Sequence, residues 1–323
     1  MVQDRVIEFA STADGTAPLY AQVFRDDRRR NLPIVAVMPG FNGTRQNILP
    51  TCIRLAEKEI CAVAVDMRGR GESAGTPDAG AVEIHDIIDA LDAVIRELND
   101  LVDPQRQSIL GYSGGGGNVL SAITKFPDRF QVAASFFGIS DYEFWYRSCG
   151  RTDCNRRMDE WIGGSPDQFP GRYQARNSAR AAGNALNCEV HLFWDEDETQ
   201  CPPRMNVIFA DTARAKGHRA VFCHQSRKGD RFRWHHGYAE DRADLIAAEE
   251  LLVPRFLQRR EDLALPPRGR LVVPGYVATR SFRFWLGDGR DGAAEIEYEL
   301  DPTPRIWLSG TSSDASNRQL PST

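Results

Sequence analysis

The stretch Ser108-Ile109-Leu110-Gly111-Tyr112-Ser113-Gly114-Gly115 decides the fold of this chain. Its first three residues are strand-like, with apolar Ile109 and Leu110, and a glycine run then leads into a segment with helical spacing. The stretch contains the pattern G-x-S-x-G, in which a sharp turn from strand to helix strains the serine backbone. Glycines two positions before and after the serine avoid the resulting clashes. The pattern therefore predicts that Ser113 is a nucleophile, presented at the edge of a sheet.

A phosphate-binding loop is the alternative interpretation of such a glycine run. A loop of that kind needs Gly-Lys-Ser/Thr, or G-x-G-x-x-G after the first strand of its unit. The run here follows a central strand and has no such lysine. We therefore favour the nucleophile turn.

Short apolar runs on both sides of this turn indicate how the sheet is built. They span residues 33–38, 61–65, 108–110, 132–137, 190–194 and 220–223, after two amphipathic strands at 6–9 and 19–24. Apolar residues at three- and four-residue spacing lie between the runs, for example over 84–98 and 245–257. This alternation predicts an α/β fold with a mostly parallel, doubly wound sheet. In such a sheet, functional residues lie on loops at the carboxyl ends of the strands.

Two segments interrupt the alternation. Residues 139–187 separate two strands by more than a usual connection and are rich in aromatic residues, so we expect a cap-like insertion of short helices over the site. We expect a catalytic domain over 1–260, a small β-rich extension over 261–310 and a disordered tail over 311–323. Within the extension, apolar alternation over 282–286 and 296–300 around a Gly-Asp-Gly turn predicts a hairpin.

A serine nucleophile needs a base, and the base needs an acid that orients it, in the order Ser, acid, His for this kind of turn. His235 and His236 lie between the last strand and the final helix. We take His236, directly before Gly237, as the base, with His235 as the alternative. Four acidic residues crowd the loop at 195–198. We favour Asp197, midway between the strand end and a proline-started helix, and Asp195 is next.

Two main-chain amides are expected to stabilise the oxyanion that forms during acyl transfer. One is the amide of Gly114, at the N-terminus of the helix after the serine. The other is the amide of Phe41, in the loop that follows the first apolar run. The candidate substrate pocket consists of aromatic rings, for which core packing is an equally good explanation: Tyr112, Tyr142, Trp145 and Tyr146.

The chain resembles α/β-hydrolases at these residues, and within them the catalytic domain of the prolyl oligopeptidase family. The resemblance covers roughly residues 30–260 and is carried by the following motifs, together with Asp197 five residues before Pro202: Val102-Asp103-Pro104-Gln105-Arg106, Pro127-Asp128-Arg129-Phe130 and Gly138-Ile139-Ser140-Asp141-Tyr142. It implies the α/β-hydrolase fold and a serine hydrolase. Peptidases of that family carry a β-propeller ahead of the catalytic domain, whereas this chain begins almost directly at the catalytic domain.

We therefore expect hydrolysis of small carboxylic esters through an acyl-enzyme on Ser113. The alternatives are a peptidase or amidase that acts on short peptides, and a non-catalytic binding protein of the same fold. The intact order of serine, acid and histidine argues against the non-catalytic protein.

Composition and charge indicate which kinds of partner the protein can bind and in which compartment we expect it. The formal net charge of −5, with both signs mixed along 323 residues, offers no attraction for nucleic acid or an anionic membrane. No apolar run approaches the ~20 residues that span a bilayer, and the charged N-terminus is unlike a secretory signal. Seven scattered cysteines favour free thiols in the cytoplasm, with a local Cys149–Cys154 pair as the alternative. We expect no cofactor and no metal. The sequence leaves open whether the protein forms a homo-oligomer.

Overall fold

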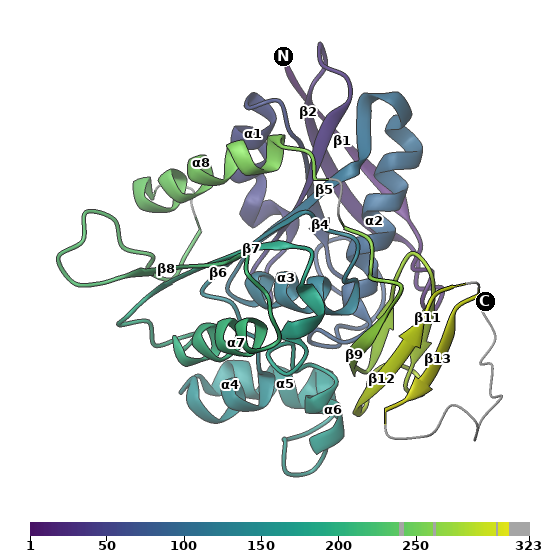
Figure 1. Ribbon diagram of the computed structural model, residues 1–323. Coiled ribbons are helices and arrows are strands. Elements are labelled where there is room, and N and C mark those ends of the chain that lie inside the picture. The colour runs from purple at the N-terminus through teal and green to yellow at the C-terminus, as the bar shows by residue number, and fades with distance from the viewer. Residues whose placement is uncertain (239–241, 261–262, 302, 310–323) are drawn as a thin grey trace.

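An eight-stranded sheet forms the centre of the computed structural model, which describes residues 1–238, 242–260, 263–301 and 303–309 (Figure 1). In spatial order the strands are β1 (Val2–Phe9), β2 (Leu19–Asp26), β4 (Cys61–Asp66), β3 (Leu32–Met38), β5 (Val102–Tyr112), β6 (Val132–Phe136), β7 (Glu189–Asp195) and β8 (Val221–Ser226). Strand β2 runs antiparallel to both of its neighbours, and all pairs from β4 to β8 are parallel. The predicted mostly parallel α/β-hydrolase sheet is confirmed.

The strand order reverses at β3, which has β4 on one side and β5 on the other. Connections therefore leave β3 and β5 in opposite directions, and the carboxyl ends of these two strands lie next to each other. Open α/β sheets bind their ligands at such a reversal. The predicted nucleophile follows β5, and the predicted oxyanion loop follows β3, so the topology brings both to this place.

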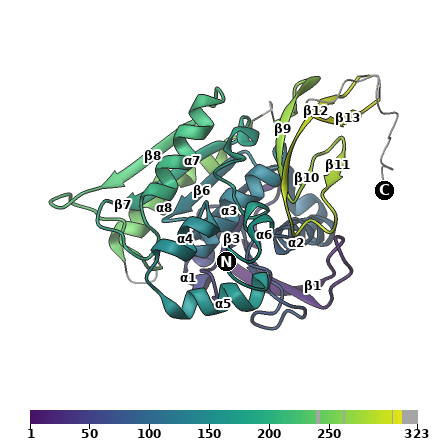
Figure 2. The same cartoon turned by 90° about the horizontal axis from the view of Figure 1, so that it is seen from below.

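Helices cover both faces of the sheet (Figures 1 and 2). Outside residues 139–187 the helices are α1 (Leu49–Glu57), α2 (Glu83–Leu98), α3 (Gly114–Lys125), α7 (Arg204–Ala215) and α8 (Ala243–Leu257), with single turns at η1 (Arg45–Ile48) and η2 (Asn99–Leu101), in the part of the chain that the structure describes. Ile34 and Ala36 of β3 pack with α2 and α3, whereas Val35 and Val37 pack with α1 and α8. Burial on both faces explains why these strands are continuous apolar runs.

The segment 139–187 contains three short helices and one 3-10 turn. They are α4 (Tyr142–Ser148), α5 (Thr152–Ile162), α6 (Pro170–Gln174) and η3 (Ala182–Ala185). Asp141 caps α4 by accepting a hydrogen bond from the amide of Phe144 at 3.0 Å. The ring of Trp161, at the end of α5, lies 4.8 Å from the ring of Phe41, between centroids. The insertion therefore lies over the loop that follows β3.

The C-terminal extension forms two small sheets, of two and three strands, beside α3 and α6 (Figures 1 and 2). Its strands are β9 (Arg268–Pro274), β10 (Tyr276–Ala278), β11 (Arg283–Trp285), β12 (Ala293–Glu299) and β13 (Arg305–Leu308). Strand β12 lies between β9 and β13, and β11 pairs with β10. The predicted hairpin between 282–286 and 296–300 is therefore wrong: Ile296 faces Leu271 of β9 across the ladder. Alternation reveals an apolar face but not which strand pairs with it. The predicted disordered tail lies outside the described residues.

The structure bears on two expectations from the sequence, one about membrane-spanning segments and one about the cysteines. In the described ranges, no helix has both the length and the apolar content that crossing a bilayer requires. All seven cysteines are free thiols, and only Cys223 is exposed. The alternative that Cys149 and Cys154 form a local disulfide is not seen in the structure.

A buried lysine joins the extension to the helix that follows the nucleophile. The Lys125 ammonium, at the end of α3, donates hydrogen bonds to the carbonyl oxygens of Ala175, at 3.0 Å, and Pro274. It also lies 4.5 Å from the centre of the Tyr276 ring. Burial, together with the nearby charge of Arg176, lowers the pKa of Lys125 from its ordinary value of 10.5 to about 7.

This pKa predicts how stability depends on pH. Between pH 7 and 10.5 the unfolded chain binds a proton on Lys125 that the folded chain has released, so the free energy of unfolding rises with pH. We expect the wild type to gain stability relative to Lys125→Met over this range, with a slope approaching about 1.4 kcal/mol per pH unit. Urea unfolding at several pH values measures it, with exposed Lys58→Met as the charge control. A difference that is independent of pH would contradict the prediction.

Candidate active site

Ser113 lies at the turn between β5 and α3, with a φ of 57° and a ψ of −122°. This left-handed conformation is rare for a residue with a side chain. The Ser113 amide donates to the carbonyl of Phe136 at 2.9 Å, which holds the turn against β6. A Cβ on Gly115 would lie 2.3 Å from the carbonyl oxygens of Met38 and Pro39, so only glycine fits there. The turn has the strained strand-to-helix geometry that exposes a nucleophilic hydroxyl.

The two predicted oxyanion donors lie side by side. A Cβ on Gly114 would lie 2.4 Å from the Cα of Phe41 and 2.5 Å from its nitrogen. The adjacent carboxyl ends of β3 and β5 produce this close approach. Because Gly114 is the first residue of α3, its amide also lies at the positive end of the helix dipole.

His236 approaches this region from the long loop between β8 and α8. Its ring centre lies 4.7 Å from that of Phe137, and the side chain is 18% exposed. Its Nδ1 atom is 3.5 Å from Oε1 of Glu198. This is long for a hydrogen bond, but catalytic hydrogen bonds often shorten only when substrate binds. His235, the alternative base, is 49% exposed, and its Nδ1 lies 4.0 Å from Oδ1 of Asp195.

Glu198 is the carboxylate beside His236. It is almost fully buried, and its Oε1 accepts hydrogen bonds from the amides of Gln200 at 2.6 Å and Cys201 at 3.2 Å. Burial opposes ionisation, but the contact with His236 and these two amides outweigh it. The pKa of Glu198 is therefore lowered from its ordinary value. An ionised carboxylate next to Nδ1 can hold the imidazole with Nε2 free to accept a proton.

The prediction that Asp197 orients the base does not agree with this geometry. The Asp197 carboxylate is 64% exposed and binds the Arg233 guanidinium, with an O–N distance of 3.0 Å. Asp195, the second choice, is fully buried and accepts hydrogen bonds from Ser226 Oγ at 2.6 Å and Arg233 Nε at 2.8 Å. Asp195 thus fastens the end of β8 and the start of the histidine segment to β7. Composition could not separate four neighbouring acids, because the direction of each side chain depends on the fold of the loop.

Cys201 contacts both Ser113 and Glu198 and was not predicted as part of the site. Its Sγ lies 3.7 Å from Ser113 Oγ, and its main-chain amide donates to Glu198. The thiol is completely buried, and burial raises its pKa well above the ordinary value, so it stays protonated. Its position after the acidic loop was visible in the sequence, but no motif marks a neutral thiol as part of a site.

Three aromatic rings surround Phe41 on the side of the insertion. Measured between ring centres, Trp161 lies at 4.8 Å, Trp145 at 5.0 Å and Tyr142 at 6.2 Å. Of the predicted pocket residues, Tyr142 and Trp145 thus lie beside the oxyanion loop, and Trp161 joins them as a residue that the sequence reasoning missed.

The other two predicted pocket residues have different contacts. Tyr112 is fully buried, and its hydroxyl donates to Glu249 of α8, so its side chain packs under that helix. The hydroxyl of Tyr146 donates to Asp159 of α5 at 3.1 Å. The prediction that both rings line a substrate pocket therefore needs correction, because a residue's place in the sequence near a site does not set the direction of its side chain.

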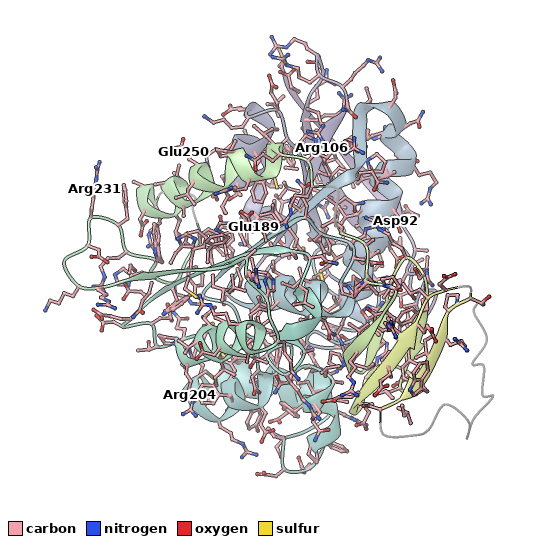
Figure 3. The ribbon with its side chains drawn as sticks, in the orientation of Figure 1. Asp92, Arg106, Glu189, Arg204, Arg231 and Glu250 are labelled. Atoms are coloured by element: carbon pink, nitrogen blue, oxygen red, sulfur yellow. The ribbon has the colours of Figure 1, made fainter. Side chains whose placement is uncertain are left out.

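The segment that carries the histidines leaves the sheet and returns to it. Arg231, in this segment, lies at the outer edge of the molecule (Figure 3). Two residues later, Arg233 binds Asp195 at the end of β7. The histidines that follow are thereby brought back toward the carboxyl ends of the strands, where Ser113 lies.

The family model described as the prolyl oligopeptidase family matches residues 51–252. This chain belongs to the prolyl oligopeptidase family. Dipeptidyl peptidase family member 1 of Caenorhabditis elegans is 24% identical over 135 residues, which are 38% of this chain and 17% of that protein. This chain therefore spans only a small part of the length of that relative.

Solved structures with the same fold include a peptidase and an esterase. An acylaminoacyl peptidase of Pyrococcus horikoshii superposes with a TM-score of 0.65 and 19% identity, over 82% of this chain and 43% of that one. An esterase of Pyrococcus furiosus superposes with a TM-score of 0.59 and 12% identity, over 79% of this chain and 91% of that one. At these identities the likeness shows the fold alone. The family to which the chain belongs is one of serine hydrolases.

Proposed function

We propose that this serine hydrolase cleaves small carboxylic esters through an acyl-enzyme on Ser113. The observation that carries the proposal is the convergence of Ser113 with two adjacent main-chain amides, those of Phe41 and Gly114. Donors that are already in place can stabilise the negative charge that develops on a carbonyl oxygen, which is the largest contribution in many acyl transfers. We assign His236 and Glu198 as the base and the acid: His236 Nδ1 lies 3.5 Å from Glu198 Oε1, and Glu198 accepts from the amide of Cys201, whose Sγ lies 3.7 Å from Ser113 Oγ.

In the proposed mechanism, Ser113 Oγ bonds to the acyl carbon while His236 Nε2 takes its proton. The oxyanion accepts hydrogen bonds from the Phe41 and Gly114 amides. When the carbonyl reforms, the bond to the leaving alkoxide breaks, and the imidazolium returns its proton to that oxygen. Water then attacks the acyl-enzyme by the same route and releases the carboxylic acid and Ser113. Glu198 stabilises the imidazolium without taking a proton from it.

The side chains around Ser113 support the proposal that the substrates are small. Cys201 lies 3.7 Å from Ser113 Oγ, so an acyl group on the serine meets a compact thiol. The rings of Tyr142, Trp145 and Trp161 enclose Phe41 on the side of the insertion. Apolar surroundings suit short acyl or aryl groups.

Hydrolysis of short peptides is the second candidate function. It is favoured by the names of the similar proteins, which include a dipeptidyl peptidase and an acylaminoacyl peptidase. An amide needs the same attack and the same oxyanion donors, but its leaving amine must be protonated by His236 before the bond breaks.

Two measurements test the proposal. A fluorophosphonate probe should label wild-type protein at Ser113, and kcat/KM should be higher for p-nitrophenyl esters of short acids than for matched aminoacyl amides. A higher kcat/KM for the amides would favour the peptidase. A folded protein that is never labelled would favour a non-catalytic binding protein and contradict both enzyme assignments.

A further inference from the structure

Tyr238 connects the histidine segment to the oxyanion loop. It lies two residues after His236, and its hydroxyl oxygen accepts a hydrogen bond from the amide of Gly40 at 2.9 Å. Gly40 directly precedes Phe41, whose amide is one of the two oxyanion donors. One hydrogen bond therefore joins a residue beside the base to a residue beside the oxyanion site, across 198 positions in the sequence.

The phenol fits closely into the hollow of the oxyanion loop. A Cβ on Gly40 would lie 2.8 Å from the Tyr238 hydroxyl oxygen and 3.9 Å from the Cβ of Ser113. A Cβ on Gly43 would lie 2.9 Å from the same hydroxyl. The Tyr238 ring packs edge-on against Tyr112, the residue before the nucleophile, with ring centres 5.8 Å apart. The hydroxyl thus occupies space that only glycines at positions 40 and 43 leave open.

We infer that Tyr238 is a positioning residue, which holds the imidazole of His236 and the amide of Phe41 at a set separation. The inference rests on the proposed function, because the separation matters only if both groups act on one substrate. Burial raises the pKa of the Tyr238 phenol, so the hydroxyl stays protonated and makes the same contact at neutral pH. Small errors in the placement of catalytic groups have large effects on rate, since the transition state needs all of them at once.

The first test removes only the hydroxyl. Tyr238→Phe should lower kcat for a p-nitrophenyl ester about tenfold while KM changes less than about twofold, since the lost contact supports the transition state and not substrate binding. Tyr173→Phe is the matched control, because the Tyr173 ring is buried and its hydroxyl donates to the carbonyl of Gly164 at 3.0 Å. A merely structural role would lower the melting temperature of both variants and leave both kcat values near that of the wild type.

The second test uses the close fit. In Gly40→Ala the new methyl meets the hydroxyl at 2.8 Å but the Cζ of Tyr238 only at 3.7 Å, which is an ordinary contact. Gly40→Ala should therefore lower kcat about a hundredfold. Adding Tyr238→Phe should restore kcat of the double variant to within about twofold of the kcat of the single variant Tyr238→Phe. In Gly43→Ala the methyl also meets Asn47 Oδ1 at 3.0 Å and the Cβ of Pro39 at 3.1 Å, so Tyr238→Phe should not rescue that variant.

The inference is overturned by a Tyr238→Phe enzyme with wild-type kcat. It is also overturned by a Gly40→Ala enzyme that Tyr238→Phe does not rescue, or by equal rescue of Gly43→Ala. The proposed function fails on a different measurement, since it requires ester hydrolysis by the wild type and labelling at Ser113. If the wild type hydrolyses esters and Tyr238→Phe leaves kcat unchanged, the proposed function stands and only this inference is removed.

Discussion

Replacing Ser113 with alanine is expected to lower kcat for p-nitrophenyl acetate by about 10⁴-fold or more. The variant keeps the two oxyanion amides, whose positions depend on backbone contacts between Gly114 and Phe41. It loses the atom that forms the acyl-enzyme, so the remaining rate reflects attack by water on substrate held at the oxyanion site. Steady-state kinetics, with labelling by a fluorophosphonate probe, measure the change.

Ser121→Ala is the matched control for this prediction. Ser121 lies on the same helix, is 2% exposed, and belongs to α3 beyond the turn. Its loss should leave kcat within about twofold of the wild type, because Ser121 is not among the groups proposed to act on the substrate. Full activity of a Ser113→Ala protein with wild-type circular dichroism would end the assignment of Ser113 as the nucleophile.

Glu198→Gln is expected to lower kcat by about 10³- to 10⁴-fold, whereas Asp197→Asn should change it less than about threefold. The side-chain amide that replaces the Glu198 carboxylate would have nearly the same shape, but it carries no charge to stabilise the imidazolium and can favour the wrong tautomer of His236. Asp197 is mainly solvent-exposed, and its ion pair with Arg233 is of the kind that contributes little. The comparison of kcat for the two variants decides between the acids.

Both substitutions remove one negative charge from the same loop, so the general electrostatic effect on substrate is matched. Thermal melting separates a folding defect from a catalytic one. If Asp197→Asn lost more activity than Glu198→Gln, the loop would have to rearrange when substrate binds, and the acid that the sequence favoured would be restored. Equal, small effects would mean that neither carboxylate orients the base.

The sequence could predict those parts of the site that depend only on the local backbone. The turn at Ser113 needs glycines at set positions whatever surrounds it, so the pattern was sufficient to predict the strained turn that the structure shows there. The choice of His236 as the base came from chain order, because the histidine lies between the last strand of the sheet and the final helix, and that choice stays a prediction. The acid did not follow, since Asp195, Asp197 and Glu198 share one loop and only the contact of Glu198 with His236 separates them.

The aromatic residues and the extension show the same limit. Tyr112 and Tyr142 were equally good pocket candidates by composition, yet one hydroxyl bonds Glu249 and the other ring lies beside Phe41. In the extension, alternation identified β12 as a strand with one apolar face, but its partners are β9 and β13. Pairing is a choice among distant segments, and a periodic pattern carries no information about which segment is chosen.

By itself, the sequence determined the α/β class, the mostly parallel sheet and the strained turn that presents Ser113. Each of these depends on hydrophobic periodicity or on backbone sterics within a few neighbouring residues. Tertiary structure alone decided that Glu198 lies beside His236 and that Tyr238 meets Gly40. Such contacts join loops that are far apart in the chain, so their geometry is set by how the whole sheet brings its carboxyl ends together.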